Sequence, residues 1–313
     1  MGTKVIKKRG IDVEQVQPGL TPPPPTAGPS FPKKPRLTGK SKKRDIPEGL
    51  WSKCPRCEAL IYDRELDDNL KVCPKCDHHG AIGARERIHS LVETCTFEEM
   101  DAGMESVDVL RFKGVASYES KLAAYKKKSS LLKDAVVTGV GTVGSHRVAL
   151  GVMDFGFLGG SMGSVVGEKL ARLIETGTDR GLPVVVFSTS GGARMYEGMF
   201  SLMQMAKTCG ALAYHARQRL PYISVLVNPC YAGVMASYAS VGDLILAEPE
   251  AMIGFAGPRV IRDTTQADLP EGFQTSEFLQ KHGLIDAIIH RRDMKTRLVN
   301  YLDFMMTGRR VLA

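Results

Sequence analysis

Four cysteines have the spacing of a metal site. Cys54 and Cys57 form one C-x2-C pair, fifteen residues follow, and Cys73 and Cys76 form a second C-x2-C pair. Each pair can direct two thiolates at one tetrahedral centre, and such a short segment needs a cross-link of this kind to fold. The doubled motif therefore predicts a zinc ribbon over residues 50–80. Because four thiolates leave no open coordination position, we expect one structural zinc ion rather than a catalytic one.

Glycine-rich loops are the second group of residues that could do chemistry. Three segments repeat one order: a short run rich in valine or isoleucine, then small residues with glycine, then a helical pattern. The runs and their loops are RVALGVMDF before GFLGGSMG, LPVVVFSTS before GGARM, and PYISVLVNP before CYAGV. This order is typical of parallel strands joined by crossover helices, and it predicts an α/β fold.

These elements would gather backbone N–H groups at one edge of the sheet, because the carboxyl ends of parallel strands and the amino ends of the following helices lie on the same side. The glycines at this edge are Gly159, Gly160, Gly191, Gly192 and Gly233. Glycine lets a substrate approach the backbone closely, and N–H groups fixed in place stabilise negative charge that develops during a reaction. We therefore expect an oxyanion site, although each loop taken singly could be an ordinary turn.

No side chain near these loops has the pattern of a catalytic base. Hydrolysis by a serine would need a base beside Ser188 or Ser190, and the G-x-S-x-G motif is absent. The phosphate-binding motif G-x-x-x-x-G-K-S/T is absent as well. GVGTVG at residues 139–144 matches a dinucleotide-binding pattern, but it lies between two apolar or alternating runs and predicts a β-hairpin. The loops thus indicate a site that works through backbone polarisation, with the basic group supplied by a substrate or cofactor.

Helical patterns surround these strands. One covers residues 85–94 and another covers residues 118–132. In the helix after GGARM, apolar residues recur at spacings of three and four, and we interpret this stripe as core packing, with a methionine-rich binding face as the alternative. The members of the stripe are Met195, Met199, Leu202, Ala206, Cys209 and Ala213.

Composition separates the N-terminal segment from the rest of the chain. The chain has 313 residues, 43% hydrophobic content and a formal net charge of +8. Residues 1–50 hold eleven Lys or Arg against four Asp or Glu, and they include the run TPPPPTAGPSFP. We predict a disordered basic, proline-rich tail over residues 1–49 and a folded domain over residues 81–313. The sequence shows no secretory apolar core and no run of eighteen apolar residues, so we expect a cytoplasmic protein without a membrane partner.

Longer motifs carry a family resemblance. From about Ile46 to about Met306, in order and with few gaps, the chain resembles the β subunit of the bacterial acetyl-CoA carboxylase carboxyltransferase. The motifs are IPEGLWSKCPRC, VCPKCDHH, DFGFLGGSMGSVVGEK, FSTSGGARM, SLMQMAKT, PYISVL, AEPEAMIGFAGPRVI and LPEGFQTSEFL. The resemblance implies a crotonase-like carboxyltransferase domain, a superhelix of ββα units, behind the zinc ribbon.

The resemblance also implies a reaction. In the family, a carboxyl group moves from carboxybiotin on a biotin carboxyl carrier protein to acetyl-CoA, and the product is malonyl-CoA for fatty acid synthesis. This subunit would bind acetyl-CoA and an α subunit would bind biotin, in an α2β2 assembly that works with biotin carboxylase. Transfer to the acetyl methyl carbon needs an enolate, whose oxygen a pair of N–H donors would stabilise. Biotin could supply the base as its carboxyl group leaves.

The resemblance assigns roles to the loop residues. The backbone would line the oxyanion site at Gly191, Gly192, Ala232 and Gly233. The thioester channel would be bordered by Gly159, Gly160, Ser161 and Met162. Arg194 and Arg259 could contact CoA phosphates or the partner, and surface salt bridges are the alternative for both.

One loop departs from the family pattern. The family usually carries Thr-x-Gly-Gly-Val before this helix, where the present chain has Cys230, Tyr231, Ala232, Gly233 and Val234. Alanine keeps its N–H but disfavours positive φ and adds a methyl group facing the site. The geometry of the donor at Ala232 is therefore open.

Two alternatives remain. The first is carboxyl transfer to another acyl-CoA, such as propionyl-CoA, because chain-length selectivity depends on the depth of a pocket. The second is nucleic acid binding by the ribbon and the tail, since basic residues surround the cysteine pairs at Lys53, Arg56, Lys71 and Lys75. Against it, the ribbon has only Trp51 and Tyr62 as aromatic residues for base stacking. His78 and His79 are potential spare metal ligands, and we expect them on the surface.

Overall fold

The structure is a computed structural model that describes residues 50–128, 132–266 and 268–307. The predicted tail over residues 1–49 lies outside this range. The described residues belong to one compact unit, which contains both the cysteine pairs and the glycine loops. The division of this unit at residue 80 into a ribbon and a larger domain stays a prediction.

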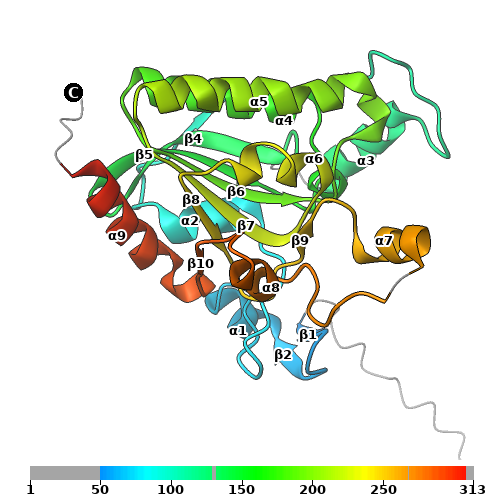
Figure 1. Cartoon of the computed structure of the whole chain (residues 1–313). Coiled ribbons are helices and arrows are strands. Elements are labelled where there is room, and N and C mark those ends of the chain that lie inside the picture. Colours follow the sequence, from blue (N-terminus) through cyan, green and yellow to red (C-terminus); the bar gives the residue numbers. More distant parts are fainter. Residues whose placement is uncertain (1–49, 129–131, 267, 308–313) are drawn as a thin grey trace, which may run out of the picture. The chain divides into compact units, whose positions relative to one another are not determined.

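A mixed β-sheet forms the centre of the unit (Figure 1). Its strands, in spatial order, are β10 (Ala287–Ile288), β8 (Leu244–Ala247), β7 (Tyr222–Tyr231), β6 (Val184–Ser190), β5 (His146–Met153), β4 (Val136–Val143) and β3 (Glu98–Met100), with β9 (Ile253–Gly254) paired to the end of β7. From β5 to β10 the strands are parallel, whereas β3, β4 and β5 are antiparallel neighbours. Every residue of β6 is buried, as expected for a parallel strand covered on both faces. The three predicted strands are confirmed, and GVGTVG lies in the β4–β5 hairpin as expected.

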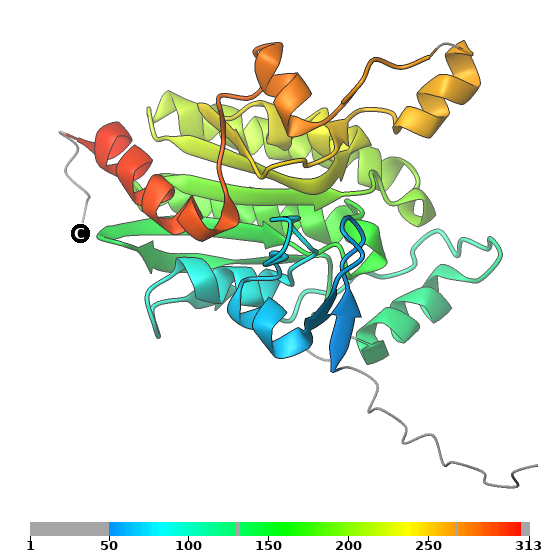
Figure 2. The same ribbon diagram turned by 90° about the horizontal axis from the view of Figure 1, so that it is seen from below.

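Helices cover both faces of the sheet (Figures 1 and 2). One face carries α4 (Ser164–Asp179) and α5 (Met199–Arg217), and the other carries α2 (Ala84–Leu91) and α9 (Met294–Met306). The remaining helices of the larger part are α3 (Tyr118–Lys128), α6 (Ala232–Met235), α7 (Pro258–Thr265) and α8 (Ser276–Lys281), with 3-10 turns η1 (Leu158–Gly160), η2 (Met195–Glu197), η3 (Tyr238–Ser240) and η4 (Arg291–Asp293). Both predicted helical regions contain a helix, although α2 ends three residues earlier than expected. Among the described residues, no helix combines the length and apolar content that a membrane span needs.

The prediction that the methionine stripe of α5 packs in the core is wrong. Met195, just before α5, is 80% exposed, Met199 is 66% exposed and Leu202 is 47% exposed. The buried face of α5 consists of Ser201, Gln204, Thr208, Ala211, Leu212 and His215. This polar face packs closely because α4 presents Gly167, where an added Cβ would lie 2.3 Å from the Gln204 side chain. The spacing of the apolar residues was predicted correctly, but the side of α5 opposite to the methionine stripe faces the core.

The ribbon consists of β1 (Trp51–Lys53), β2 (Leu60–Tyr62), α1 (Asp63–Asp68) and the turns that carry the cysteines. A buried arginine, held by a buried carboxylate, fixes it to the larger part through hydrogen bonds. Arg291 binds Glu248 through two nitrogens at 2.8 and 2.6 Å and donates to the carbonyl oxygens of Leu70 and Gly80 at 2.7 and 3.0 Å. Burial raises the pKa of Glu248, but Arg87 and Arg291 outweigh it and hold that pKa well below its usual range.

The expected surface position of His79 is wrong. Its side chain is 3% exposed, and its Nδ1 lies 3.4 Å from the Glu248 carboxylate. His79 therefore belongs to the buried contact between the ribbon and the larger part. Its position in the sequence, close to the second cysteine pair, does not predict this burial.

Candidate active site

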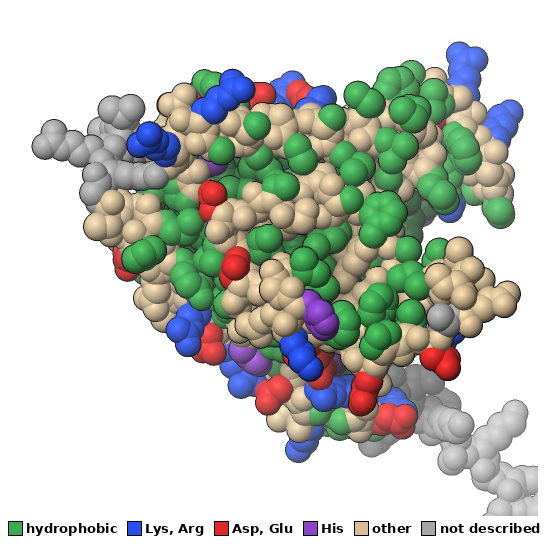
Figure 3. All heavy atoms as spheres, viewed as in Figure 1, with side chains coloured by type: hydrophobic (Ala, Val, Ile, Leu, Met, Phe, Trp, Pro, Cys, Tyr) green, Lys and Arg blue, Asp and Glu red, His purple; other side chains and the backbone are tan. Residues whose placement is uncertain are grey.

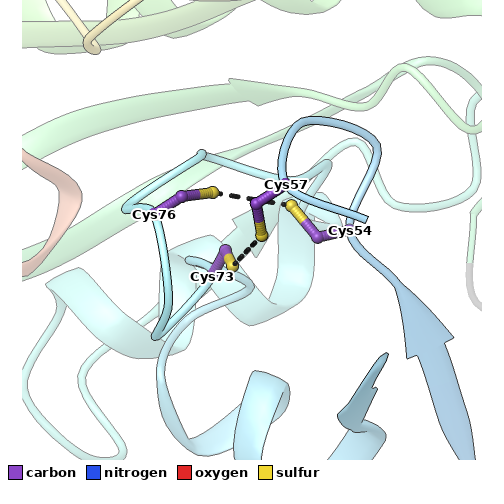
Figure 4. Close-up of side chains that lie close together, drawn as sticks. All are labelled: Cys54, Cys57, Cys73 and Cys76. Carbon is purple, nitrogen blue, oxygen red and sulfur yellow. Dashed lines mark hydrogen bonds between the residues drawn. The ribbon is translucent and has the colours of Figure 1, made fainter. Parts of the chain in front are cut away.

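The four cysteines converge as the spacing predicts (Figure 4). Their Sγ atoms lie within 4.8 Å of one another, and the Cys54–Cys76 and Cys57–Cys73 Sγ distances are both 3.7 Å. A zinc ion with Zn–S bonds of about 2.3 Å in tetrahedral geometry holds its sulfurs about 3.8 Å apart. The donor set therefore fits zinc, and its four thiolates fill the coordination shell.

The four thiols shift the pKa values of one another. Burial raises the pKa of Cys54, but hydrogen bonds from the backbone of Cys57 and Arg56, together with neighbouring thiols, outweigh it and lower that pKa to about 7. Burial and the neighbouring thiols raise the pKa of Cys76 to about 12. Four thiolates in such close contact repel one another, so that complete deprotonation requires a bound cation.

The first two glycine loops meet at the carboxyl ends of β5 and β6. The N–H of Gly191 donates to the carbonyl oxygen of Gly159 at 2.8 Å. The N–H of Met162 donates to the Gly192 carbonyl oxygen at 2.9 Å, and the N–H of Arg194 donates to the Met162 carbonyl oxygen at 2.9 Å. The two loops are therefore tied together as a short parallel bridge beyond the ends of their strands.

The third loop follows β7 and packs against the other two. Ala232 has a φ of +52°, so the conformation that alanine disfavours is present here. Gly192 has a φ of +128°, and an added Cβ there would lie 3.0 Å from the Ala232 methyl group. An added Cβ on Gly233 would lie 3.3 Å from the Met162 side chain. All three predicted loops thus come together at one edge of the sheet.

Several of the expected N–H donors are already bonded inside the protein. Gly191 donates to the Gly159 carbonyl oxygen, Gly192 donates to the Ser190 hydroxyl at 2.9 Å, and Ala232 donates to the Phe255 carbonyl oxygen at 2.9 Å. Of the four backbone positions predicted to line an oxyanion site, Gly233 alone has an N–H without an acceptor among the residues that the structure describes.

Ala193 was not predicted from the sequence, and its N–H also has no acceptor within the described ranges. In a parallel bridge the central residue turns its own N–H away from its partner. Met162 bonds to the residues on either side of Ala193, so the Ala193 N–H points away from Met162. Because β7 is the other neighbour of β6, this direction leads to the loop that contains Gly233.

The expected contact of Arg194 with CoA phosphates is wrong. The Arg194 side chain is 1% exposed, and it binds Asp134 through two nitrogens at 2.7 and 3.0 Å. Burial raises the pKa of Asp134, but Arg194 outweighs it and lowers that pKa below its usual value. Arg259 is 93% exposed and lies 3.7 Å from Asp263 on the same helix, which fits the surface salt bridge named as its alternative.

Comparisons with known proteins identify relatives along most of the chain. The model of the carboxyl transferase domain matches residues 77–277, and that of the acetyl-CoA carboxylase zinc finger domain matches residues 51–76. A protein from Methylacidiphilum infernorum named acetyl-coenzyme A carboxylase carboxyl transferase subunit beta is 54% identical over 272 residues, which cover 87% of this chain and 98% of the relative. A protein of the same name from Desulforamulus reducens is 52% identical over 277 residues, with coverage of 88% and 95%. The chain belongs to this family of carboxyl transferase beta subunits.

Membership in the carboxyl transferase beta subunits confirms the predicted enzyme class and the predicted fold. A solved transcarboxylase 12S with bound methylmalonyl-coenzyme A is 27% identical with a TM-score of 0.60, and the match covers 72% of this chain. It covers 41% of the transcarboxylase chain, so the present chain spans less than half the length of that protein. The parallel strands, the crossover helices and the ribbon of four cysteines agree with the expected crotonase-like α/β fold behind a zinc ribbon.

Proposed function

We propose that this chain binds acetyl-CoA and transfers to it the carboxyl group of carboxybiotin. The product is malonyl-CoA, the starting point of fatty acid synthesis. The names of the relatives support acetyl-CoA as the acceptor. The observation that carries the proposal is the pair of N–H groups at Ala193 and Gly233, which lie in adjoining loops without an acceptor among the described residues.

The chemistry needs this pair of donors. When the carboxyl group leaves the biotin nitrogen as carbon dioxide, that nitrogen would take a proton from the methyl group of acetyl-CoA, and the negative charge would move to the thioester oxygen as an enolate. Two N–H groups fixed at that oxygen stabilise the charge only as it forms, which lowers the barrier more than it tightens substrate binding. The enolate carbon would then form a bond with the carbon dioxide, which gives malonyl-CoA. The chain needs no catalytic base of its own, and Ser188 and Ser190 are fully buried.

A partner would complete the site, and the exposed face of α5 is suited to bind it. We call this surface the α5 face, and it contains Met195, Met199, Phe200, Leu202 and Met203, which are 47% to 80% exposed. The loop before α3 extends it with Val107, Val109, Leu110 and Val115. Apolar side chains gather over the end of α5 and this loop in Figure 3. An exposed apolar patch of this kind marks a protein interface.

We infer that the partner at the α5 face is the alpha subunit, which binds biotin in an α2β2 assembly. Biotin reaches the site on a biotin carboxyl carrier protein, and biotin carboxylase belongs to the wider complex. The name of the relatives, subunit beta, supports a complex with other subunits.

Carboxyl transfer from malonyl-CoA to a free biotin derivative tests the proposal. The full chain is assayed alone, the alpha subunit is assayed alone, and the two are then mixed. We expect transfer only in the mixture, with malonyl-CoA preferred to methylmalonyl-CoA as donor. Absence of transfer in a mixture that contains the folded complex would refute the proposed reaction, and a preference for methylmalonyl-CoA would favour propionyl-CoA as the acceptor.

Nucleic acid binding by the ribbon finds less support. Three of its four basic candidates form ion pairs inside the protein, which are Lys53 with Glu58, Arg56 with Glu250, and Lys71 with Asp67. These pairs reduce the positive potential that a phosphate backbone would meet.

A further inference from the structure

The side chain of Arg194 lies beneath the two glycine loops that hold the Ala193 N–H. Its five N–H donors all have partners, as the burial of a charged group requires. Nε donates to the Ser161 hydroxyl at 3.1 Å, and Nη2 donates to the Ser161 carbonyl oxygen at 2.8 Å. Nη2 and Nη1 together hold Asp134 at 2.7 and 3.0 Å, and Nη1 also donates to the Ser106 hydroxyl at 2.9 Å. The guanidinium therefore joins the loop after β5 to the start of β4.

A second carboxylate connects the same loops to α4. Glu197 accepts a bond of 2.6 Å from the Tyr118 hydroxyl with one oxygen and a bond of 2.6 Å from the Ser164 N–H, at the start of α4, with the other. Gly163 allows this packing, because an added Cβ there would lie 2.6 Å from the Glu197 carboxylate and 2.9 Å from the Arg194 guanidinium. The cluster is filled so tightly that the loops cannot shift without breaking its hydrogen bonds.

Both acceptor-free N–H groups depend on this cluster. The Ala193 N–H belongs to the residue directly before Arg194, and the Arg194 main chain is bonded to Met162. Met162 is fully buried and supports the loop of Gly233 from below, since its methyl group would lie 3.3 Å from a Cβ at that position. A movement of the Arg194 side chain would displace Ser161 and Met162, and with them both donors.

We propose that Arg194 is a positioning residue, which holds the N–H groups of Ala193 and Gly233 in the geometry that the enolate oxygen requires. This inference rests on the proposed function. Arg194 touches no substrate, because its side chain is buried and all its donors are used within the protein. It acts through the two loops. Displacement of a reacting group by about 1 Å can lower a rate about a hundredfold. A small shift of the two N–H groups, caused by a change in the Arg194 cluster, should therefore lower kcat.

The variant Arg194→Lys tests the proposal in the full chain with its alpha subunit. Lysine keeps the charge beside Asp134 but has three donors and no planar fork, so it cannot hold Asp134 and Ser161 together. We expect kcat for carboxyl transfer from malonyl-CoA to fall about 10- to 100-fold while KM for malonyl-CoA stays within about twofold. We also expect faster amide hydrogen exchange in peptides that contain residues 161–163 and 192–194.

The chain offers a matched control in Arg291, which is also buried and also binds a carboxylate through two nitrogens. Arg291 donates to two carbonyl oxygens, whereas Arg194 donates to one carbonyl oxygen and to hydroxyl groups. Arg291 connects the ribbon to the larger part of the protein, whereas Arg194 connects the glycine loops to β4. Arg291→Lys should lower the melting temperature and leave kcat unchanged. Should Arg194→Lys fail to fold, Ser106→Ala removes one bond to Arg194 and one to Asp134, and we expect a smaller change in kcat and in hydrogen exchange in the same direction.

Unchanged kcat and unchanged exchange in Arg194→Lys would overturn the proposal. An equal loss of kcat in Arg291→Lys would also overturn it, because the effect would then follow from stability alone. Hydrogen exchange separates this inference from the proposed function. If the wild-type complex transfers no carboxyl group, the proposed function fails, and the exchange rates still decide whether Arg194 holds the loops.

Discussion

At the scale of single residues, the three glycine loops show what a sequence can and cannot predict about a site. The loops were predicted because small residues follow each apolar run. The sequence did not predict which N–H groups lack an acceptor within the protein. The Gly191 N–H, for example, donates to a carbonyl oxygen thirty-two residues earlier in the chain. That partner exists only once β5 and β6 lie side by side, and for the same reason Ala193 was missed.

The departure at Ala232 leads to a prediction. Ala232 holds a φ of +52°, where a non-glycine residue is strained by about 1 kcal/mol, and its N–H is used in the bond to Phe255. Ala232→Gly should therefore give equal or higher carboxyl transfer and equal or slightly higher thermal stability, in steady-state assays and thermal melts. Gly192→Ala is the matched control and should be inactive, because its methyl group would lie 3.0 Å from that of Ala232. A large loss of activity in Ala232→Gly would show that the loop works differently.

The cysteine cluster leads to a second prediction at this scale. Cys73 is 2% exposed and is one of four sulfurs that fit a single zinc ion. Cys73→Ser should lower the zinc content, measured by atomic absorption, from about one ion per chain to near zero, because a hydroxyl is a poor zinc ligand. Cys95→Ser is the control, since Cys95 is exposed and lies outside the cluster. Full zinc content in Cys73→Ser would rule out the four-thiolate site.

At the scale of elements, the strands were predicted more reliably than the faces of the helices. Parallel strands are buried on both sides, so β5, β6 and β7 read directly as apolar runs. Helix α5 has apolar residues on one side and hydrogen-bonded polar residues on the other. Periodicity predicts that the apolar residues lie on one side of the helix, but it does not predict whether that side faces the core or the solvent. In this protein Gly167 of α4 leaves space for Gln204, so the polar side of α5 packs against α4. The apolar side is exposed.

The α5 face gives a prediction for assembly. Met199→Glu introduces a charge at a side chain that is 66% exposed, so the fold should keep its stability while affinity for the alpha subunit falls at least about tenfold. Sedimentation velocity of the mixture measures the association, and thermal melting of the chain alone checks the fold. Arg217→Glu, at the other end of α5, should leave association unchanged. Normal assembly of Met199→Glu would place the interface elsewhere.

At the scale of the whole molecule, two buried carboxylates connect distant parts of the chain. Glu248 joins the ribbon to the sheet through Arg291, and Asp134 joins the glycine loops to β4 through Arg194. Both carboxylates have pKa values below their usual range in the folded protein. Neither contact was predictable from the sequence, because the partners are separated by 43 residues in one case and 60 in the other.

These pKa shifts predict how stability depends on pH. A carboxylate with a depressed pKa stabilises the fold fully above its unfolded pKa, about 4 for Asp and Glu, and loses this contribution as the pH falls through its folded pKa. The free energy of unfolding, measured by urea titration, should therefore be insensitive to these two groups from pH 7 to about 5 and fall steeply below about pH 4. Glu248→Gln should be less stable at neutral pH and show a shallower slope in the acid range, by up to about 1.4 kcal/mol per pH unit. An unchanged slope would show that Glu248 does not titrate in this way.

The most direct measurement concerns the two acceptor-free N–H groups. Replacing the amide of Ala193 with an ester, by incorporating the α-hydroxy acid counterpart of alanine, removes this N–H and keeps the side chain. In the complex with the alpha subunit, we expect kcat for carboxyl transfer to fall about 100- to 1000-fold, as for loss of one oxyanion donor, with KM for malonyl-CoA nearly unchanged. The same replacement at Gly191, whose N–H is bonded to Gly159, should affect stability more than rate. A wild-type kcat after replacement at Ala193 would contradict an oxyanion site built from these loops.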